Sequence, residues 1–176
     1  QDQIAAAFGG FNRIDFTADG YKVTPLNITE ERKAKLNDNL MMFFTGLSRY
    51  SFHVQKATKK MLCQKTSELL EILKMVDEAE RLLVDPCAPL DDFGLMLNET
   101  WKLKRSISNE ISTDFIDELY QKALDAGALG GKLLGAGGGG CLLFYVPEEK
   151  QEHLRKSFCD LYEVDFKFEN EGTKII

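Results

Sequence analysis

Cysteine and histidine are scarce in this sequence, and long apolar runs are missing. Its 176 residues include four cysteines and two histidines, with no CxxC pair, so the clustered ligands of a zinc site are absent. The cysteines are also too sparse for a secreted disulfide scaffold. We therefore expect reduced, mostly buried thiols in a cytoplasmic protein, at positions Cys63, Cys87, Cys141 and Cys159.

No apolar run approaches the roughly 18 residues that a membrane-spanning helix needs, so the sequence predicts no membrane partner. Basic residues number 22 and acidic residues 28, and the net charge of −6 argues against a nucleic-acid partner. The charge is uneven, because basic residues outnumber acidic ones over residues 1–60 and acidic ones dominate residues 61–126. The first third of the chain is therefore the better place to receive an anion.

An initiator methionine, a basic leader and a cleavage site are also missing from the start of the chain, which reads Gln1-Asp2-Gln3. We expect the chain to be one piece of a longer protein. Its length is sufficient to bury one hydrophobic core without metal or disulfide support.

Hydrophobic periodicity predicts an α+β fold. Strands at 12–17 and 21–25 around Asp19-Gly20 indicate a hairpin, and residues 40–44 form an apolar run typical of a buried strand. Helical stripes follow over about 50–61, 67–84, 91–107 and 114–126. The remaining residues predict a strand, a glycine-rich loop, a strand at 141–146, a helix beginning at Pro147 and a strand at 164–168. This order favours helices packed on an antiparallel sheet.

The glycine-rich loop is the strongest local signal. Residues without Cβ let another backbone or a ligand approach closely, and a run of N–H groups can cradle a phosphate. No Gly-Lys-Ser/Thr follows, which excludes a Walker A loop, and the glycines enter a strand, which excludes a dinucleotide fingerprint. The alternative is a tight strand connection that binds nothing. The loop comprises Gly135, Ala136, Gly137, Gly138, Gly139 and Gly140.

Other candidates depend on their context. Asp2 is either a solvated surface carboxylate or part of a site beside which a helix packs closely through the small residues 5–10. Arg49 follows Thr45-Gly46 at the end of the predicted strand, where it can bind a phosphate through two hydrogen bonds or form a surface salt bridge. A solvated face is expected, with phosphate contact as the alternative, at Lys102, Lys104 and Arg105.

Several segments together resemble the GHMP kinases, the family of galactokinase, homoserine, mevalonate and phosphomevalonate kinases. Residues 132–145 (KLLGAGGGGCLLFY) resemble the third motif of that family. Residues 1–12 resemble the segment that carries the catalytic aspartate in its sugar-kinase branch. Residues 45–49, 101–106 and 126–131 are similar to those of D-glycero-D-manno-heptose 7-phosphate kinases. The resemblance extends over the whole chain and corresponds to the C-terminal portion of such a kinase.

The resemblance implies transfer of the γ-phosphoryl group of ATP to a sugar hydroxyl, the anomeric one of a heptose phosphate. Asp2 is then the general base, and Gly135 to Gly140 pack against the ATP phosphate loop. We assign the substrate's existing phosphate to Arg49, with Thr45 and Gly46 in the same segment. ATP and Mg²⁺ are the implied cofactors. Their main ligands lie upstream of Asp2 in the family, so we expect no metal ligand in this fragment and no activity from it alone.

The resemblance also divides the chain. Residues 1–30 are expected to end the N-terminal kinase domain, and residues 31–176 to form the GHMP kinase C-terminal domain with a ferredoxin-like β-α-β ending. The implied partners are a sugar phosphate and ATP, and sheet edges without their upstream strands favour self-association. The alternatives are another small-molecule kinase of the family, of the fucose, galactose or mevalonate type, or a non-catalytic binding domain of the same fold.

Overall fold

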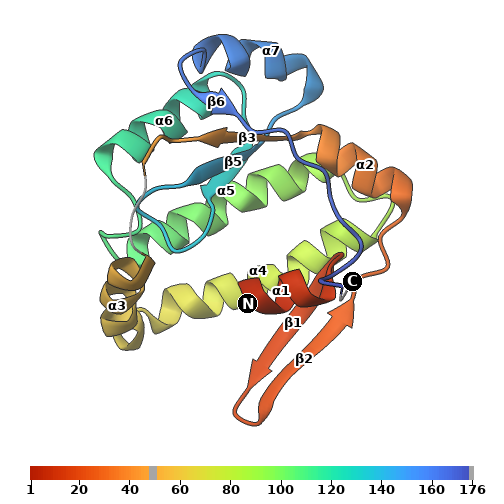
Figure 1. The fold of residues 1–176 in the computed structure, drawn as a ribbon, viewed down its shortest axis with the longest axis vertical. Helices are drawn as coiled ribbons and strands as arrows, with labels where there is room; N and C mark the ends of the chain where they lie inside the picture. Colours follow the sequence, from red (N-terminus) through yellow and green to blue (C-terminus); the bar gives the residue numbers. More distant parts are fainter. Residues whose placement is uncertain (48–50, 175–176) are drawn as a thin grey trace.

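The computed structural model describes residues 1–47 and 51–174, and it has the predicted α+β architecture (Figure 1). A two-stranded hairpin and a four-stranded antiparallel sheet are surrounded by helices. In chain order, the elements are α1 (Asp2–Phe8), β1 (Asn12–Thr17), β2 (Gly20–Pro25), α2 (Glu30–Asp38), β3 (Leu40–Phe44), α3 (Ser51–Met61), a 3-10 turn (Leu62–Gln64), α4 (Thr66–Val84), α5 (Leu90–Ile107), α6 (Asp114–Asp125), β4 (Gly130–Leu133), β5 (Cys141–Tyr145), α7 (Glu148–Ser157) and β6 (Tyr162–Glu163).

The larger sheet has the strand order β4-β5-β3-β6. Both β5 and β6 pair antiparallel with β3, so they run in the same direction with β3 between them. The helix α7 connects them, which is the split β-α-β arrangement of ferredoxin-like folds.

One face of this sheet is fully covered. Phe43 and Phe144 point to this face, and both are buried completely or nearly so. The ring of Phe43 packs edge-on against Phe158 beyond α7, with centroids 5.0 Å apart, and Phe144 lies 5.6 Å from Tyr120 of α6. This face, with α6 and α7, forms the main hydrophobic core.

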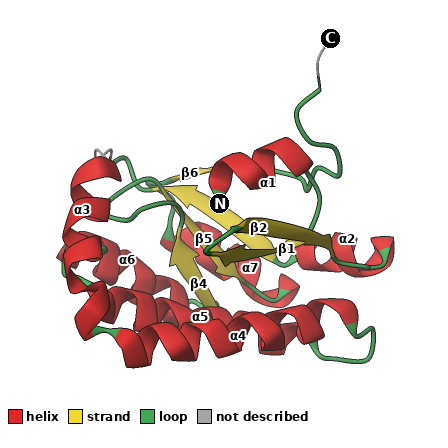
Figure 2. Ribbon diagram, turned by 90° about the horizontal axis from the view of Figure 1, so that it is seen from below, coloured by secondary structure: helices red, strands yellow, loops and turns green. Residues whose placement is uncertain are grey.

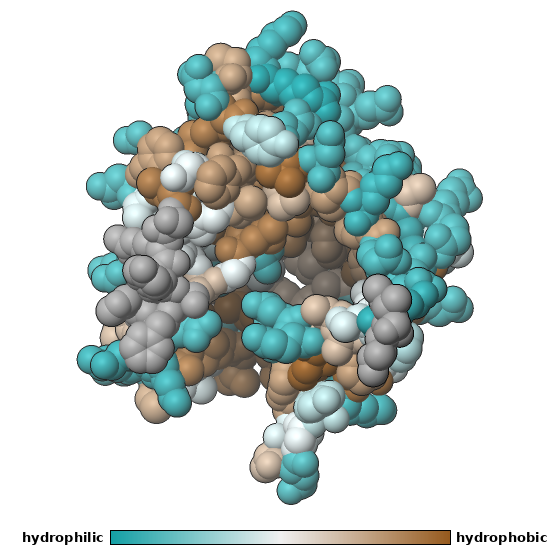
Figure 3. Space-filling view, viewed as in Figure 1, coloured by the Kyte–Doolittle hydropathy of each residue, from teal (hydrophilic) through white to brown (hydrophobic). Residues whose placement is uncertain are grey.

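The other face is covered only in part. At Gly130 of β4, a Cβ would lie 2.1 Å from the carbonyl oxygen of Gly94, so the absence of side chains lets α5 lie directly on the sheet. Farther across this face Met42 and Leu143 are only half-buried, and Phe44 is 41% exposed. Figure 3 shows a hollow on this side of the molecule, between the sheet and α1.

The hairpin and α1 lie outside the sheet. Figure 2 shows α1 near one edge of the molecule and the α4–α5 pair at the opposite edge. The guanidinium of Arg13 in β1 forms ion pairs with Asp77 and Glu80 of α4 at 2.7 and 2.9 Å, which ties the hairpin to that helix. The chain's C-terminal segment holds α1, because the N–H of Thr173 donates to the carbonyl of Ala6 at 3.0 Å.

Three structural expectations were wrong. The alternating residues 164–168 do not continue β6: Phe168 instead packs on Phe11, with ring centroids 4.7 Å apart, and its N–H donates to the side chain of Asn37. In α4 the buried face is not the one that the hydrophobic pattern predicts: Leu73, which was expected on the buried face, is 60% exposed. Cys63, Cys87 and Cys159 are exposed because they lie in turns and loops at or between helices, and Cys141 is half-buried because it is the first residue of β5.

Candidate functional site

The glycine loop is held by two other segments of the chain. The N–H of Gly138 donates to the carbonyl of Ile111 at 2.9 Å, and that of Gly140 donates to the carbonyl of Leu47 at 2.9 Å. A Cβ on Gly137 would lie 2.7 Å from the Ile111 oxygen, and its φ of +115° is itself rarely adopted by other residues. These glycines are therefore needed for close backbone packing, and two of their amides are already occupied.

Thr45 serves this packing directly. Its hydroxyl is buried and donates to the carbonyl of Gly140 at 2.8 Å, while its own N–H donates to the same oxygen at 2.9 Å. Gly46, which follows it, is exposed with a φ of +73°. The loop is thus fastened to the end of β3. Arg49, assigned above to a substrate phosphate, lies outside the described residues.

Asp2 is the first residue of α1, and its side chain is exposed. Among the small residues 5–10, the three alanines are exposed, whereas Gly9 packs closely, because a Cβ there would lie 2.3 Å from the backbone of Glu171. A concavity of about 310 Å³ lies between α1 and the hairpin, and its lining includes Asp2, Asn12 and Phe16.

Two half-buried lysines, Lys104 and Lys132, stand near the start of the glycine loop. Lys104 of α5 donates from its ammonium group to the carbonyl of Gly135 at 3.0 Å. Its pKa is lowered to about 8, mainly by burial and then by the charge of Lys132, while the carboxylate of Asp2 opposes the shift. Burial likewise lowers the pKa of Lys132 in β4, again against the charge of Asp2.

Reasoning from the sequence named Lys104 only with phosphate contact as the alternative, and it did not single out Lys132. Lys104 was expected on a solvated face with Lys102 and Arg105, but Lys104 and Arg105 are both half-buried. Lys132 stands two residues after Gly130 in β4 and therefore points to the same sheet face, the one that α5 covers in part. That alternation was the signal in the sequence that could have identified Lys132 as a site residue.

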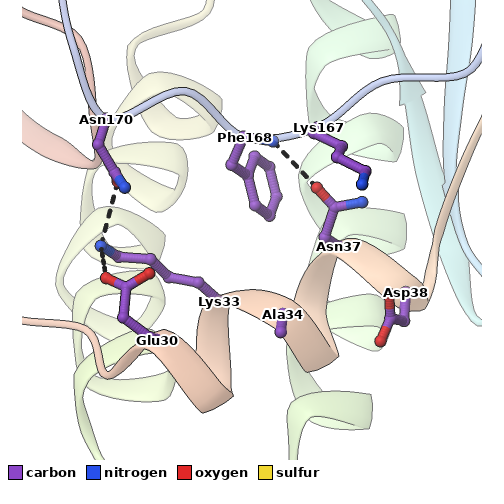
Figure 4. Close-up of a pocket in the computed structure, with 8 residues that line it drawn as sticks. All are labelled: Glu30, Lys33, Ala34, Asn37, Asp38, Lys167, Phe168 and Asn170. Atoms are coloured by element: carbon purple, nitrogen blue, oxygen red, sulfur yellow. Dashed lines mark hydrogen bonds and ion pairs between the residues drawn. The ribbon is translucent and has the colours of Figure 1, made fainter.

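Other concavities are less suited to a ligand. Figure 4 shows one of about 270 Å³ between α2 and the C-terminal segment, where Lys33 is already bonded to Glu30 and Asn170. Another, of about 430 Å³, lies where α5 ends and α6 begins, and there the guanidinium of Arg105 is paired with Asp117. The pairing of Arg105 is incomplete, because its Nε is buried and has no hydrogen-bond partner among the described residues.

The described part of the chain has no group of side chains placed to hold a metal ion and no helix suited to span a membrane. Within residues 1–47 and 51–174, no three His, Cys, Asp or Glu side chains are grouped to hold a metal ion. No helix there has the length and apolar character to cross a bilayer.

Comparison with known proteins identifies the family. The model for the C-terminal part of the GHMP kinases matches residues 88–164, which include α5, α6, the glycine loop and β5. Residues 88–164 match the GHMP kinase C-terminal domain. The predicted family and fold class are thereby confirmed.

Individual relatives align with this chain well beyond residues 88–164. The D-glycero-alpha-D-manno-heptose 7-phosphate kinase of Campylobacter jejuni is 32% identical over 99% of this chain and 52% of its own length. A crystal structure of a C. jejuni protein provisionally described as a sugar kinase aligns with a TM-score of 0.64 and 30% identity, over 98% of this chain and 49% of that one. The fold is also that of L. major mevalonate kinase, with a TM-score of 0.69 and 19% identity over 92% of this chain and 50% of that one. The chain thus spans about half the length of these relatives.

Proposed function

We propose that this chain supplies the catalytic carboxylate and the glycine loop of an ATP-dependent sugar kinase, one that phosphorylates the anomeric hydroxyl of a heptose phosphate. The observation that carries the proposal is an exposed carboxylate, Asp2, at the start of α1 in a chain whose glycine loop is held by hydrogen bonds to Ile111 and Leu47. The identity of 32% with a heptose phosphate kinase over nearly the whole chain supports the substrate class.

In the proposed reaction, Asp2 accepts the proton of the sugar hydroxyl as that oxygen forms a bond to the γ-phosphorus of ATP. The bond from this phosphorus to the oxygen shared with the β-phosphate breaks, and ADP leaves. Phosphoryl transfer depends mostly on positioning and on neutralising charge. An exposed carboxylate at the start of a helix can meet a substrate, and a loop braced at Ile111 and Leu47 can hold its shape.

The remaining assignments belong to the same proposal. Residues 1–30 contribute to the N-terminal kinase domain and residues 31–176 form the C-terminal domain, with Thr45, Gly46 and Arg49 on the substrate side. We assign ATP binding to the half of the kinase beyond these 176 residues. Mg²⁺ accompanies ATP there, and no step is assigned to it here because the described residues offer no group of ligands. The 176-residue chain alone is therefore expected to show no turnover.

A second candidate is a kinase of the mevalonate type. It is favoured by the structural likeness to mevalonate kinase, which concerns the fold alone at 19% identity. A panel of phosphorylated sugars, free sugars and mevalonate separates the two, because the heptose proposal requires preference for a phosphorylated sugar.

The decisive experiment replaces Asp2 with Asn in the full-length polypeptide that contains this chain. Loss of the base should lower kcat at least about 100-fold without changing the unfolding midpoint. Asp19→Asn is the matched control, because Asp19 is an exposed carboxylate in the hairpin turn, where Asn-Gly is equally suitable. Phosphotransfer at the normal rate by the Asp2→Asn protein would refute the mechanism.

A further inference from the structure

Lys132 lies in a row of residues on the open face of the sheet. In the β4–β5 register it stands opposite Leu143, and Leu143 stands opposite Met42 of β3. Directly opposed residues share a face, so this lysine and two half-buried apolar side chains form one continuous strip. The strip leads to the part of the sheet that α5 leaves uncovered, where Phe44 of β3 is 41% exposed.

Lys104 reaches the same place from α5. Its ammonium group lies 3.0 Å from the carbonyl oxygen of Gly135 and 6.0 Å from the centre of the Trp101 ring. Lys132 stands in β4, three residues before Gly135, on the sheet face that α5 covers in part. Two cations from different elements thus meet where the glycine loop begins.

Neither lysine has a carboxylate of the described residues within ion-pair distance, whereas two other lysines do. Lys102, on the same helix, pairs with Glu99 at 2.7 Å, and Lys65 pairs with Glu68 at 2.8 Å. Neither Lys104 nor Lys132 forms an ion pair with a carboxylate of the described residues, although both are half-buried. Holding like charges together away from water is unfavourable unless an anion offsets them.

We propose that Lys104 and Lys132 bind a phosphoryl group, which docks beside Gly135 at the edge of the open sheet face. A doubly charged oxyanion with several acceptor oxygens matches two ammonium groups better than a single carboxylate does. The exposed Gly135 has no side chain to obstruct it. The lysines also offset the repulsion that the carboxylate of Asp2 exerts on an incoming anion.

The identity of the phosphoryl group rests on the proposed function. It is either the phosphate already present on the sugar or the group in transit from ATP. Both have the same chemistry, and the binding site itself does not depend on which one is correct.

The first experiment measures binding of inorganic phosphate to the 176-residue chain by calorimetry. Lys104→Met and Lys132→Met should each weaken binding at least about tenfold, because each removes one charge from a desolvated pair. Lys102→Met, two residues from Lys104 and paired with Glu99, is the matched control and should bind like the unaltered chain. Lys104→Arg keeps a cation and should retain binding, and an unchanged unfolding midpoint shows that each variant is folded.

Two results would overturn the proposal. One is that the unaltered chain does not bind phosphate at millimolar concentration. The other is that Lys102→Met weakens binding as much as Lys104→Met, since the effect would then be one of general charge. The Asp2→Asn variant should bind phosphate at least as tightly as the unaltered chain, so the binding test is independent of the general-base test.

Turnover of the full-length protein then distinguishes the two sources. If the lysines hold the sugar's own phosphate, Lys132→Met raises KM for phosphorylated sugars and leaves KM for free sugars and ATP unchanged. If they hold the group in transit, kcat falls for every acceptor. Unchanged kcat and KM would contradict a role at the site.

Discussion

Alanine substitutions in the glycine loop test the packing on which the proposed site depends. Gly137→Ala combines a φ of +115° with a Cβ only 2.7 Å from the Ile111 oxygen. The backbone conformation costs about 1–2 kcal/mol for a residue with a Cβ, and displacing a packed neighbour costs about 1–3 kcal/mol. Gly135→Ala has a φ of +75° but its Cβ would meet no described atom within 4 Å, so only the first cost applies. Gly139→Ala meets the Leu47 oxygen at 2.8 Å, which brings only the second.

Urea unfolding of the 176-residue chain measures these differences. We expect Gly137→Ala to lower the free energy of unfolding by about 2–5 kcal/mol. Gly135→Ala and Gly139→Ala should each lower it clearly less. The slope of this free energy against urea concentration should be similar in all three variants. Gly20→Ala, in the hairpin turn with a φ of +140° and open space around it, is the control for backbone conformation alone. If Gly137→Ala costs no more than Gly20→Ala, the loop is not packed against the segment that contains Ile111, and the geometry assigned to the site is wrong.

Two further predictions concern charge. Arg32 is 9% exposed, and its guanidinium donates to the carbonyls of Leu83 and Ala88 at 3.0 and 2.8 Å, where α4 ends. Arg32→Met should therefore lower the free energy of unfolding by about 3–5 kcal/mol, whereas exposed Arg81→Met should change it little, and equal urea midpoints for the two variants would contradict this. Sulfate, which keeps its charge between pH 6 and 10, should bind less tightly as pH rises above about 8, because Lys104 then loses its proton while facing Lys132 from β4 and Asp2 from α1. Lys104→Met should flatten this dependence in a calorimetric pH series, and an unchanged slope would exclude Lys104 as its cause.

The depressed pKa of Lys104 also has a consequence for stability. Between about pH 8 and the ordinary range of a lysine, the unfolded chain holds more protons at this position than the folded chain does. As pH rises over that interval, this residue therefore increases the free energy of unfolding. The affinity for the anion decreases over the same interval.

Much of the local structure could be predicted because its causes are local. The apolar run 40–44 is β3 in the structure, and the Asp19-Gly20 turn joins β1 to β2. Thr113 begins α6 as expected, because its hydroxyl accepts the N–H of Ile116 three residues later. The glycine loop also stood out, since so many residues without side chains are unusual anywhere.

The sequence by itself thus determined the α+β class and the family resemblance, and it supplied the proposed site residues Asp2 and Gly135 to Gly140. The tertiary structure decided which other residues surround them. The helix α2 was not predicted because its sequence is mostly polar; contacts of Arg32 and the buried Leu36 hold it. Lys104 and Lys132 have ordinary sequence surroundings, and only the packing of α5 on β4 brings them together near Asp2. The placement of these side chains depends on contacts between distant parts of the chain, and no short sequence pattern encodes such contacts.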